Sequence, residues 1–173
     1  MKTEWTIAAI AAASLLAVAC GQKDEATSKN EAQAPPAAAT AAPNAADTIK
    51  ARQANLKKLG GALKAMTDES KKDNADLAVF KTQAPIIAGL APQLHDWFPA
   101  GTGAEAGVKT AAKPEIWAQP DVFKQRADAF AAAAAKFSTT VDGGDLAAIK
   151  AGVAPLGGAC RECHQTFRQR DES

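Results

Sequence analysis

The stretch Cys160-Arg161-Glu162-Cys163-His164 lies close to the C-terminal end of the chain. Its spacing is the attachment signature of c-type haem, because two thiols one helical turn apart can each add to a vinyl group of one porphyrin. The residue that follows them, His164, can then reach the iron with an imidazole nitrogen. The pattern predicts one haem c, covalently bound through Cys160 and Cys163, with His164 as an axial ligand of its iron.

Two other uses of paired cysteines fit the surrounding sequence less well. A thioredoxin-like redox pair also has this spacing, but it needs an α/β context, and no strand pattern lies near residues 160–163. A structural zinc site needs further ligands, and the remaining candidates, His95 and Cys20, do not stand in a paired spacing. The histidine directly after the second cysteine therefore favours haem.

The composition bounds both the fold and the partners. The 173 residues carry a net charge of +1, which suggests neither a nucleic-acid-binding surface nor an acidic substrate. Aromatic residues are few, tyrosine is absent and alanine is abundant. Because alanine is the strongest helix former, we expect one all-α domain with closely spaced helices. The number of cysteines is odd, so Cys20 needs an explanation separate from the haem motif.

The N-terminal residues supply that explanation. An apolar run over residues 6–18 follows Lys2 and is too short to span a bilayer, which is typical of a signal peptide over residues 1–19. The run ends in Ala17-Val18-Ala19-Cys20, which fits ordinary signal cleavage and also resembles the bacterial lipoprotein box. We expect Cys20 to be lipidated and to anchor the protein to a membrane on the periplasmic side. The alternative is an incidental cysteine near a mature N-terminus.

Residues 20–46 are rich in alanine and proline and show no apolar period. We interpret them as a disordered tether between the anchor and a domain over residues 47–173.

From Asp47 onward, apolar residues recur at alternating steps of three and four, which predicts four helices packed as a bundle. The helices are expected from residue 47 to about 66, from about 76 to 98, from 120 to 142 and from about 145 to 167. Pro85 and Pro92 should kink or break the second helix. A long crossover loop is expected over residues 99–113.

The last predicted helix carries the haem motif on its apolar face. Asp145 is a plausible N-cap, and both Cys160 and Cys163 continue the row of apolar residues. The haem should therefore lie inside the bundle. Pro155 and the Gly157-Gly158 pair are expected to interrupt this helix just before the motif, either loosening one turn or marking a kink.

Several other side chains are candidates for contact with the haem. Arg52 is a cation within the apolar row of the first helix, and a buried guanidinium needs an anion, such as a haem propionate; Gln53 would add a neutral donor. The alternative for Arg52 is a solvated residue with an acidic partner. Arg168 follows His164 by one turn and could lie near its imidazole. His95 is off the apolar row, and Met66 is more typical of a core residue.

The sequence resembles the cytochrome c′ family of class II c-type cytochromes. The resemblance covers about residues 48–170 and rests on four blocks: Ile49-Lys50-Ala51-Arg52-Gln53-Ala54-Asn55-Leu56, Pro114-Glu115-Ile116-Trp117, Phe123-Lys124-Gln125 and residues 160–168. It implies an antiparallel four-helix bundle, often a homodimer, with His164 as the only protein ligand of the iron. It also implies Leu56 over the vacant face and Arg52 and Gln53 at the propionates. Ala51 stands where the family commonly has an aromatic residue, and contacts from the long loop cannot be carried over.

The resemblance implies a periplasmic, five-coordinate haem protein that transfers electrons, binds nitric oxide or carbon monoxide, or does both. A low-spin, six-coordinate electron carrier is the alternative, and it would need Met or His in place of Leu56. A haem enzyme such as a peroxidase would need acid/base groups that a Leu56-lined pocket does not offer, so we expect no enzyme. The alanine run at residues 131–135 agrees with the homodimer; the alternative is that it packs inside the monomer or merely favours helix formation.

Overall fold

A computed structural model describes residues 41–170. These residues form four long helices, α1 (Ala45–Ser70), α2 (Leu77–Leu90), α4 (Pro120–Asp142) and α5 (Leu146–Phe167). Three short elements join them: the 3₁₀ helices η1 (Ala91–Trp97) and η2 (Ala104–Ala106), and α3 (Glu115–Ala118). The predicted signal peptide, Cys20 and most of the predicted tether lie outside the described residues.

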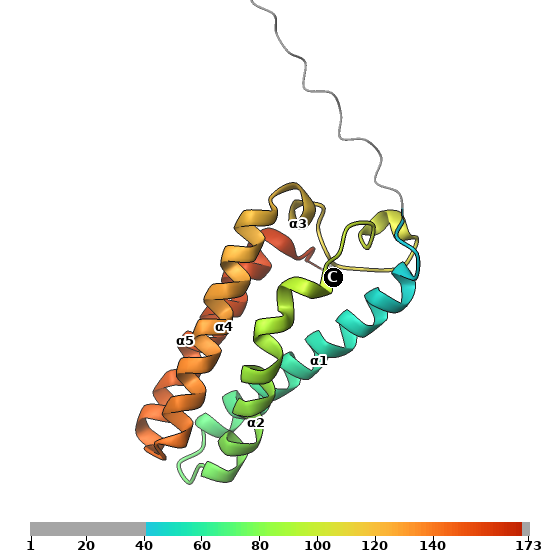
Figure 1. The fold of residues 1–173 in the computed structure, drawn as a ribbon. Coiled ribbons are helices and arrows are strands. Elements are labelled where there is room, and N and C mark those ends of the chain that lie inside the picture. Colours follow the sequence, from blue (N-terminus) through green and yellow to red (C-terminus); the bar gives the residue numbers. More distant parts are fainter. Residues whose placement is uncertain (1–40, 171–173) are drawn as a thin grey trace, which may run out of the picture. The chain divides into compact units, whose positions relative to one another are not determined.

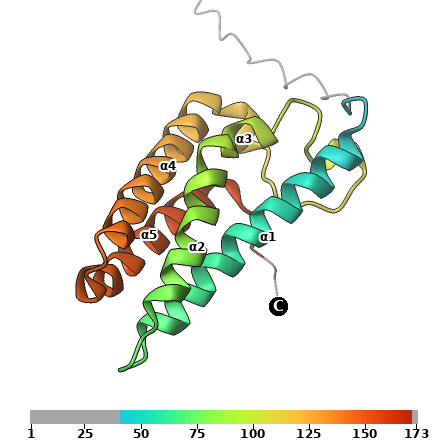
Figure 2. The ribbon, with the colours of Figure 1, turned by 60° about the horizontal axis from the view of Figure 1, so that its bottom comes forward.

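The four long helices run alternately in opposite directions along the chain, as Figure 1 and the turned view in Figure 2 show. Short connections join α1 to α2 and α4 to α5, which makes these neighbours antiparallel. The predicted antiparallel four-helix bundle is confirmed. None of the helices in residues 41–170 is both long and apolar enough to cross a membrane.

The predicted apolar face of α4 is buried along its whole length. It supplies Phe123, Ala127, Phe130, Ala134, Phe137 and Val141 to the core. On α1 the row is less complete, because Leu56 and Leu63 are only half-buried whereas Ile49, Leu59 and Met66 are buried. Both half-buried leucines line a cavity described below, which explains their exposure.

Capping side chains fix where α2 and α5 begin. The Asp145 carboxylate accepts hydrogen bonds from the backbone N–H groups of Ala147 and Ala148, at 3.0 and 3.3 Å, so the predicted N-cap is confirmed. Asp76 caps α2 in the same way, through Ala78 N at 2.8 Å. The first helix begins at Ala45, slightly before the predicted Asp47.

The prolines and glycines act differently in the two helices that contain them. α2 continues through Pro85 and changes to the 3₁₀ helix η1 near Pro92, in line with the predicted break. The predicted interruption of the last helix is wrong, because α5 is continuous through Pro155 and the Gly157-Gly158 pair. Burial of its apolar face against α4 outweighs the weak helix propensity of these residues.

Candidate haem site

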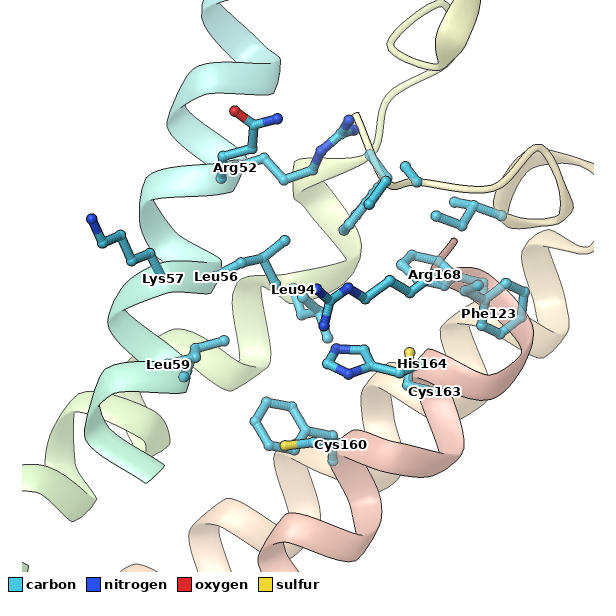
Figure 3. Close-up of a pocket in the computed structure, with 18 of the residues that line it drawn as sticks. Arg52, Leu56, Lys57, Leu59, Leu94, Phe123, Cys160, Cys163, His164 and Arg168 are labelled. Atoms are coloured by element: carbon cyan, nitrogen blue, oxygen red, sulfur yellow. The ribbon is translucent and has the colours of Figure 1, made fainter. Parts of the chain in front are cut away.

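A cavity of about 440 Å³ lies between α1 and α5 and reaches the aromatic side chains of α4. Figure 3 shows side chains from both helices projecting into it. Its lining is mainly apolar and combines residues from α1, η1, α4, α5 and the segment 110–112. Cavities of this kind, mostly apolar with a few placed polar groups, are typical of cofactor sites.

The wall formed by α5 carries the predicted haem motif. Cys163 is buried and Cys160 is half-buried, and both line the cavity. Burial raises the pKa of Cys163 to about 11, with a smaller contribution from Cys160, and burial also raises the pKa of Cys160. Both side chains are therefore neutral thiols near neutral pH, and both stand on the same helical face, one turn apart.

His164 projects from α5 into the cavity, toward the side formed by α1 (Figure 3). Partial burial lowers the pKa of its imidazole, and the positive charge of Arg168 lowers it further. The imidazole is therefore neutral near neutral pH, and a neutral imidazole is the form that binds a metal. Arg168, predicted to lie near this ring, also lines the cavity.

The facing wall on α1 is apolar at its centre. Leu56 projects from α1 into the cavity, with Leu59 one turn further along (Figure 3). Leu94 and Phe98 extend this apolar wall from η1 and the residue that follows it. None of these side chains can donate a hydrogen bond or bind a metal, so this side of the cavity offers space without a ligand.

Arg52 is buried, with 2% of its surface exposed. Its Nη1 donates to Thr102 Oγ1 at 3.1 Å, and its Nη2 donates to Thr102 O and to Thr110 Oγ1, both at 3.0 Å. Its guanidinium carbon lies 4.5 Å from the ring centroid of Phe98. Burial lowers its pKa, and the charge of Glu105 partly opposes this. The alternative of a solvated Arg52 is wrong, and its direct partners in the described chain are neutral oxygens.

Gln53 lines the cavity beside Arg52, and its Nε2 donates to Lys109 O at 2.9 Å. The loop that holds both side chains therefore takes part in the site through Thr102, Lys109 and Thr110. Sequence reasoning missed these loop residues, because they follow no period and the loop departs from the family pattern. The buried cation itself was the only signal, since it required oxygen partners from some other part of the chain.

Two candidates with metal-binding side chains do not reach the site. His95 is exposed, with Nδ1 3.4 Å from Asp96 Oδ1, and it does not line the cavity. Met66 is completely buried in the core between the helices. Residues 41–170 contain no group of three or more His, Cys, Asp or Glu side chains that could hold a metal ion.

The residues of the cavity fit haem c. Its charged side chains are Arg52, Lys57 and Arg168, and no carboxylate is among the described lining residues. Such a lining suits a flat apolar ring with anionic substituents, because buried cations attract the anions that compensate them. Two thiols and one neutral imidazole on the opposite wall match covalent attachment and axial ligation. Fold and site together define a helical-bundle haem protein of the c type.

Comparison with known proteins gives the family. A family model described as Cytochrome C′ matches residues 47–168. Cytochrome c′ of Pararhodospirillum photometricum is 35% identical over 121 residues, which cover 70% of this chain and 95% of that protein. Cytochrome c′ of Rubrivivax gelatinosus is 44% identical over 70 residues, and this match spans 40% of the chain and about half (54%) of that relative. The chain belongs to the cytochrome c′ family and, like its members, binds one covalent haem c.

A solved structure extends the likeness to the fold. It is a nitric oxide complex of a mutant cytochrome c′ from Alcaligenes xylosoxidans, with a TM-score of 0.65 and 28% identity. The likeness covers 73% of this chain and 97% of that one.

Proposed function

We propose that Cys160 and Cys163 carry the haem through thioether bonds and that His164 is the only protein ligand of a five-coordinate iron. The protein would then transfer single electrons, bind nitric oxide or carbon monoxide, or do both. One observation carries this proposal: the cavity has thiols and an imidazole on its α5 wall, and the apolar Leu56 and Leu59 form the centre of the α1 wall across from them.

Haem c, when bound, supplies an iron centre that exchanges electrons and takes up small gases. The chain's own residues determine what reaches that centre. Leu56 lines the side of the cavity that faces His164 and offers no hydrogen-bond donor, so it favours small gases that need none. Arg52 and Gln53 would bind the propionates, and Arg168 would modulate the imidazole. These roles are supported by the fact that all the proposed site residues line one cavity: Arg52, Gln53, Leu56, Cys160, Cys163, His164 and Arg168.

The nitric oxide complex of the Alcaligenes relative supports gas binding by this chain. The test is an optical spectrum of the purified protein, oxidised and reduced, with and without nitric oxide. We expect a covalent c-type haem with a high-spin, five-coordinate spectrum that changes on addition of nitric oxide. A low-spin spectrum that nitric oxide leaves unchanged would contradict both the vacant face and gas binding.

The two alternative functions have less support. A six-coordinate electron carrier needs a second ligand, and the described lining contains neither a methionine nor a second imidazole. A peroxidase needs an acid/base group on the open side. The described cavity lining has no carboxylate, and Arg52 is held by Thr102 and Thr110. We therefore infer a role in electron transfer or gas binding rather than in catalysis.

Export to the bacterial periplasm and membrane anchoring through a lipidated Cys20 are part of the same proposal. They are supported by the apolar leader and the small residues before Cys20. Mass spectrometry of the membrane fraction tests the anchor. A mature form that begins at Cys20 with added acyl mass is expected, whereas an unmodified soluble form contradicts lipidation.

A homodimer is the proposed assembly. Of the alanine run, Ala134 packs inside the subunit, while Ala132 and Ala135 are exposed on α4 and leave a smooth surface. Sedimentation at micromolar concentration should give twice the subunit mass, and Ala132→Glu should weaken the association more than a glutamate placed at exposed Ala78 of α2. A mass at or below the 17.8 kDa of the full chain would contradict the dimer.

A further inference from the structure

Thr102 lies in the loop between η1 and α3 and has no exposed surface. Its hydroxyl donates to Pro99 O at 2.7 Å and accepts from Arg52 Nη1, while its carbonyl oxygen accepts from Arg52 Nη2. The donation to Pro99 directs the hydroxyl hydrogen away from the guanidinium, which leaves a lone pair for Arg52. The hydroxyl and the carbonyl oxygen of this one residue therefore both hold the cation.

Thr110 fixes the guanidinium from a second direction. Its hydroxyl oxygen accepts from Arg52 Nη2 at 3.0 Å and from the backbone N–H of Ala112 at 3.1 Å. A guanidinium has five N–H donors, so these bonds to Thr102 and Thr110 leave the Nε–H and one Nη1–H for another acceptor. The guanidinium carbon also lies over the ring of Phe98. The position of the cation is thus defined from three sides.

The loop that supports Arg52 is held by bonds of its own. Trp117 Nε1 donates to Phe98 O at 3.0 Å and to Pro99 O at 3.1 Å, and Ala42 N donates to Gly101 O at 2.9 Å. These bonds do not involve Arg52, so the loop is held independently of the arginine that it supports. Such preorganisation is what a site needs to hold a charge at a fixed position.

We propose that Thr102, together with Thr110, is a positioning residue that holds Arg52 as a fixed cation at the cavity and thereby raises the reduction potential of the haem. This inference rests on the proposed function, in which Arg52 serves the propionates. The acceptors on Thr102 and Thr110 are neutral oxygens, so they fix the guanidinium and leave its charge in place. A carboxylate in their position would cancel that charge. A fixed positive charge stabilises the reduced site, because that site carries one positive charge less than the oxidised one.

The test is a double-mutant cycle that measures the reduction midpoint potential by spectroelectrochemical titration of the haem-loaded protein. Thr102→Val keeps the shape and removes the hydroxyl, and Thr102→Ser is the control that retains it. Each change is made with Arg52 present and in an Arg52→Gln background. We expect Thr102→Val to shift the potential to lower values only when Arg52 is present, and Thr102→Ser to keep the wild-type potential.

Two results would overturn the inference: no shift in Thr102→Val with Arg52 present, or an equal shift in both backgrounds. If Thr102→Val yields no folded haem protein, the same cycle is carried out with Thr110→Val, at a more exposed residue. A shift of the midpoint potential that requires Arg52 is again the expected result. The experiment distinguishes failure of the proposed function from failure of the inference about the threonines. A wild-type protein without covalent haem contradicts the proposed function, whereas attached haem with an unshifted potential contradicts only the role of the threonines.

Discussion

Gly152 of α5 packs so closely on Phe137 of α4 that a Cβ atom at position 152 would lie 3.0 Å from the phenylalanine ring. The ring is buried, so Gly152→Ala should cost about 1–3 kcal/mol through overpacking, which exceeds or offsets the gain of about 1 kcal/mol from helix propensity. Gly61→Ala is the matched control, since a Cβ there meets nothing within 4 Å. It should stabilise α1 by about 1 kcal/mol through helix propensity alone. Urea unfolding of both variants measures the difference, and equal effects would contradict the close packing.

Covalent attachment of the haem should depend on both motif cysteines. Cys160→Ala or Cys163→Ala should each leave at most one thioether and an unstable haem protein, and the double variant should lose all covalent haem. Haem staining on a denaturing gel measures this. Cys20→Ser is the matched control and should keep the full stain. A stain that survived loss of both Cys160 and Cys163 would refute the attachment site.

Leu56 should limit the binding of carbon monoxide to the iron. The gas needs no hydrogen-bond donor but must displace the leucine from its packing, so Leu56→Ala should raise affinity. Each tenfold gain would correspond to about 1.4 kcal/mol of relieved crowding. Leu63→Ala, on the same helix and lining the same cavity, is the control and should change affinity little. Unchanged carbon monoxide affinity and spin state in Leu56→Ala would show that another residue, such as Phe98, limits access to the iron.

Glu69 should make the stability of the bundle depend on pH. Its buried carboxylate accepts from Lys72 Nζ at 2.7 Å and from Asp76 N at 2.8 Å, and these bonds lower its pKa from the ordinary 4.5, the one from Lys72 most. A lowered carboxyl pKa stabilises the fold above about pH 4.5, and this contribution is lost as the pH falls through the folded-state value.

Glu69→Gln should therefore lower the melting temperature at neutral pH, and its difference from wild type should shrink as the pH falls below about 4.5. Asp73→Asn, which removes an exposed carboxylate from the connection that follows α1, is the matched control for the substitution. Thermal melts between pH 3 and 7, a range chosen to bracket the ordinary carboxyl pKa, measure both. A constant difference between Glu69→Gln and wild type over this range would contradict the lowered pKa.

The sequence predicted the helices best where an apolar period runs without a break. The row from Phe123 to Val141 met no proline or glycine, and its helix appears as expected. The effect of Gly157 and Gly158 was misjudged, because local propensity does not include the packing of α5 on α4. Proline proved a better guide at Pro92, which lies in the first turn of η1, where a missing backbone N–H costs least because it would be unpaired anyway.

The site was predictable in its chemistry and only partly in its contacts. Motif spacing placed the thiols and His164 on one helical face, and the helical period brought Leu56 and Arg52 to the interior. The partners of Arg52 could not be predicted, since Thr102 and Thr110 lie in a loop without periodicity and reach α1 only through the tertiary fold. A buried cation signals that oxygen partners exist without indicating where they lie in the chain.

The cavity lies between the first and the last long helix of the described chain, which has a consequence for biosynthesis. A chain that emerges N-terminus first presents Leu56 and Arg52 early and the thiols of α5 last. α1 and α2 can associate through contacts that are local in the sequence, whereas the cavity acquires its second wall only when α5 docks. The α4–α5 pair is equally local in the sequence, so we expect the two walls of the haem cavity to meet only when the two helix pairs dock on each other.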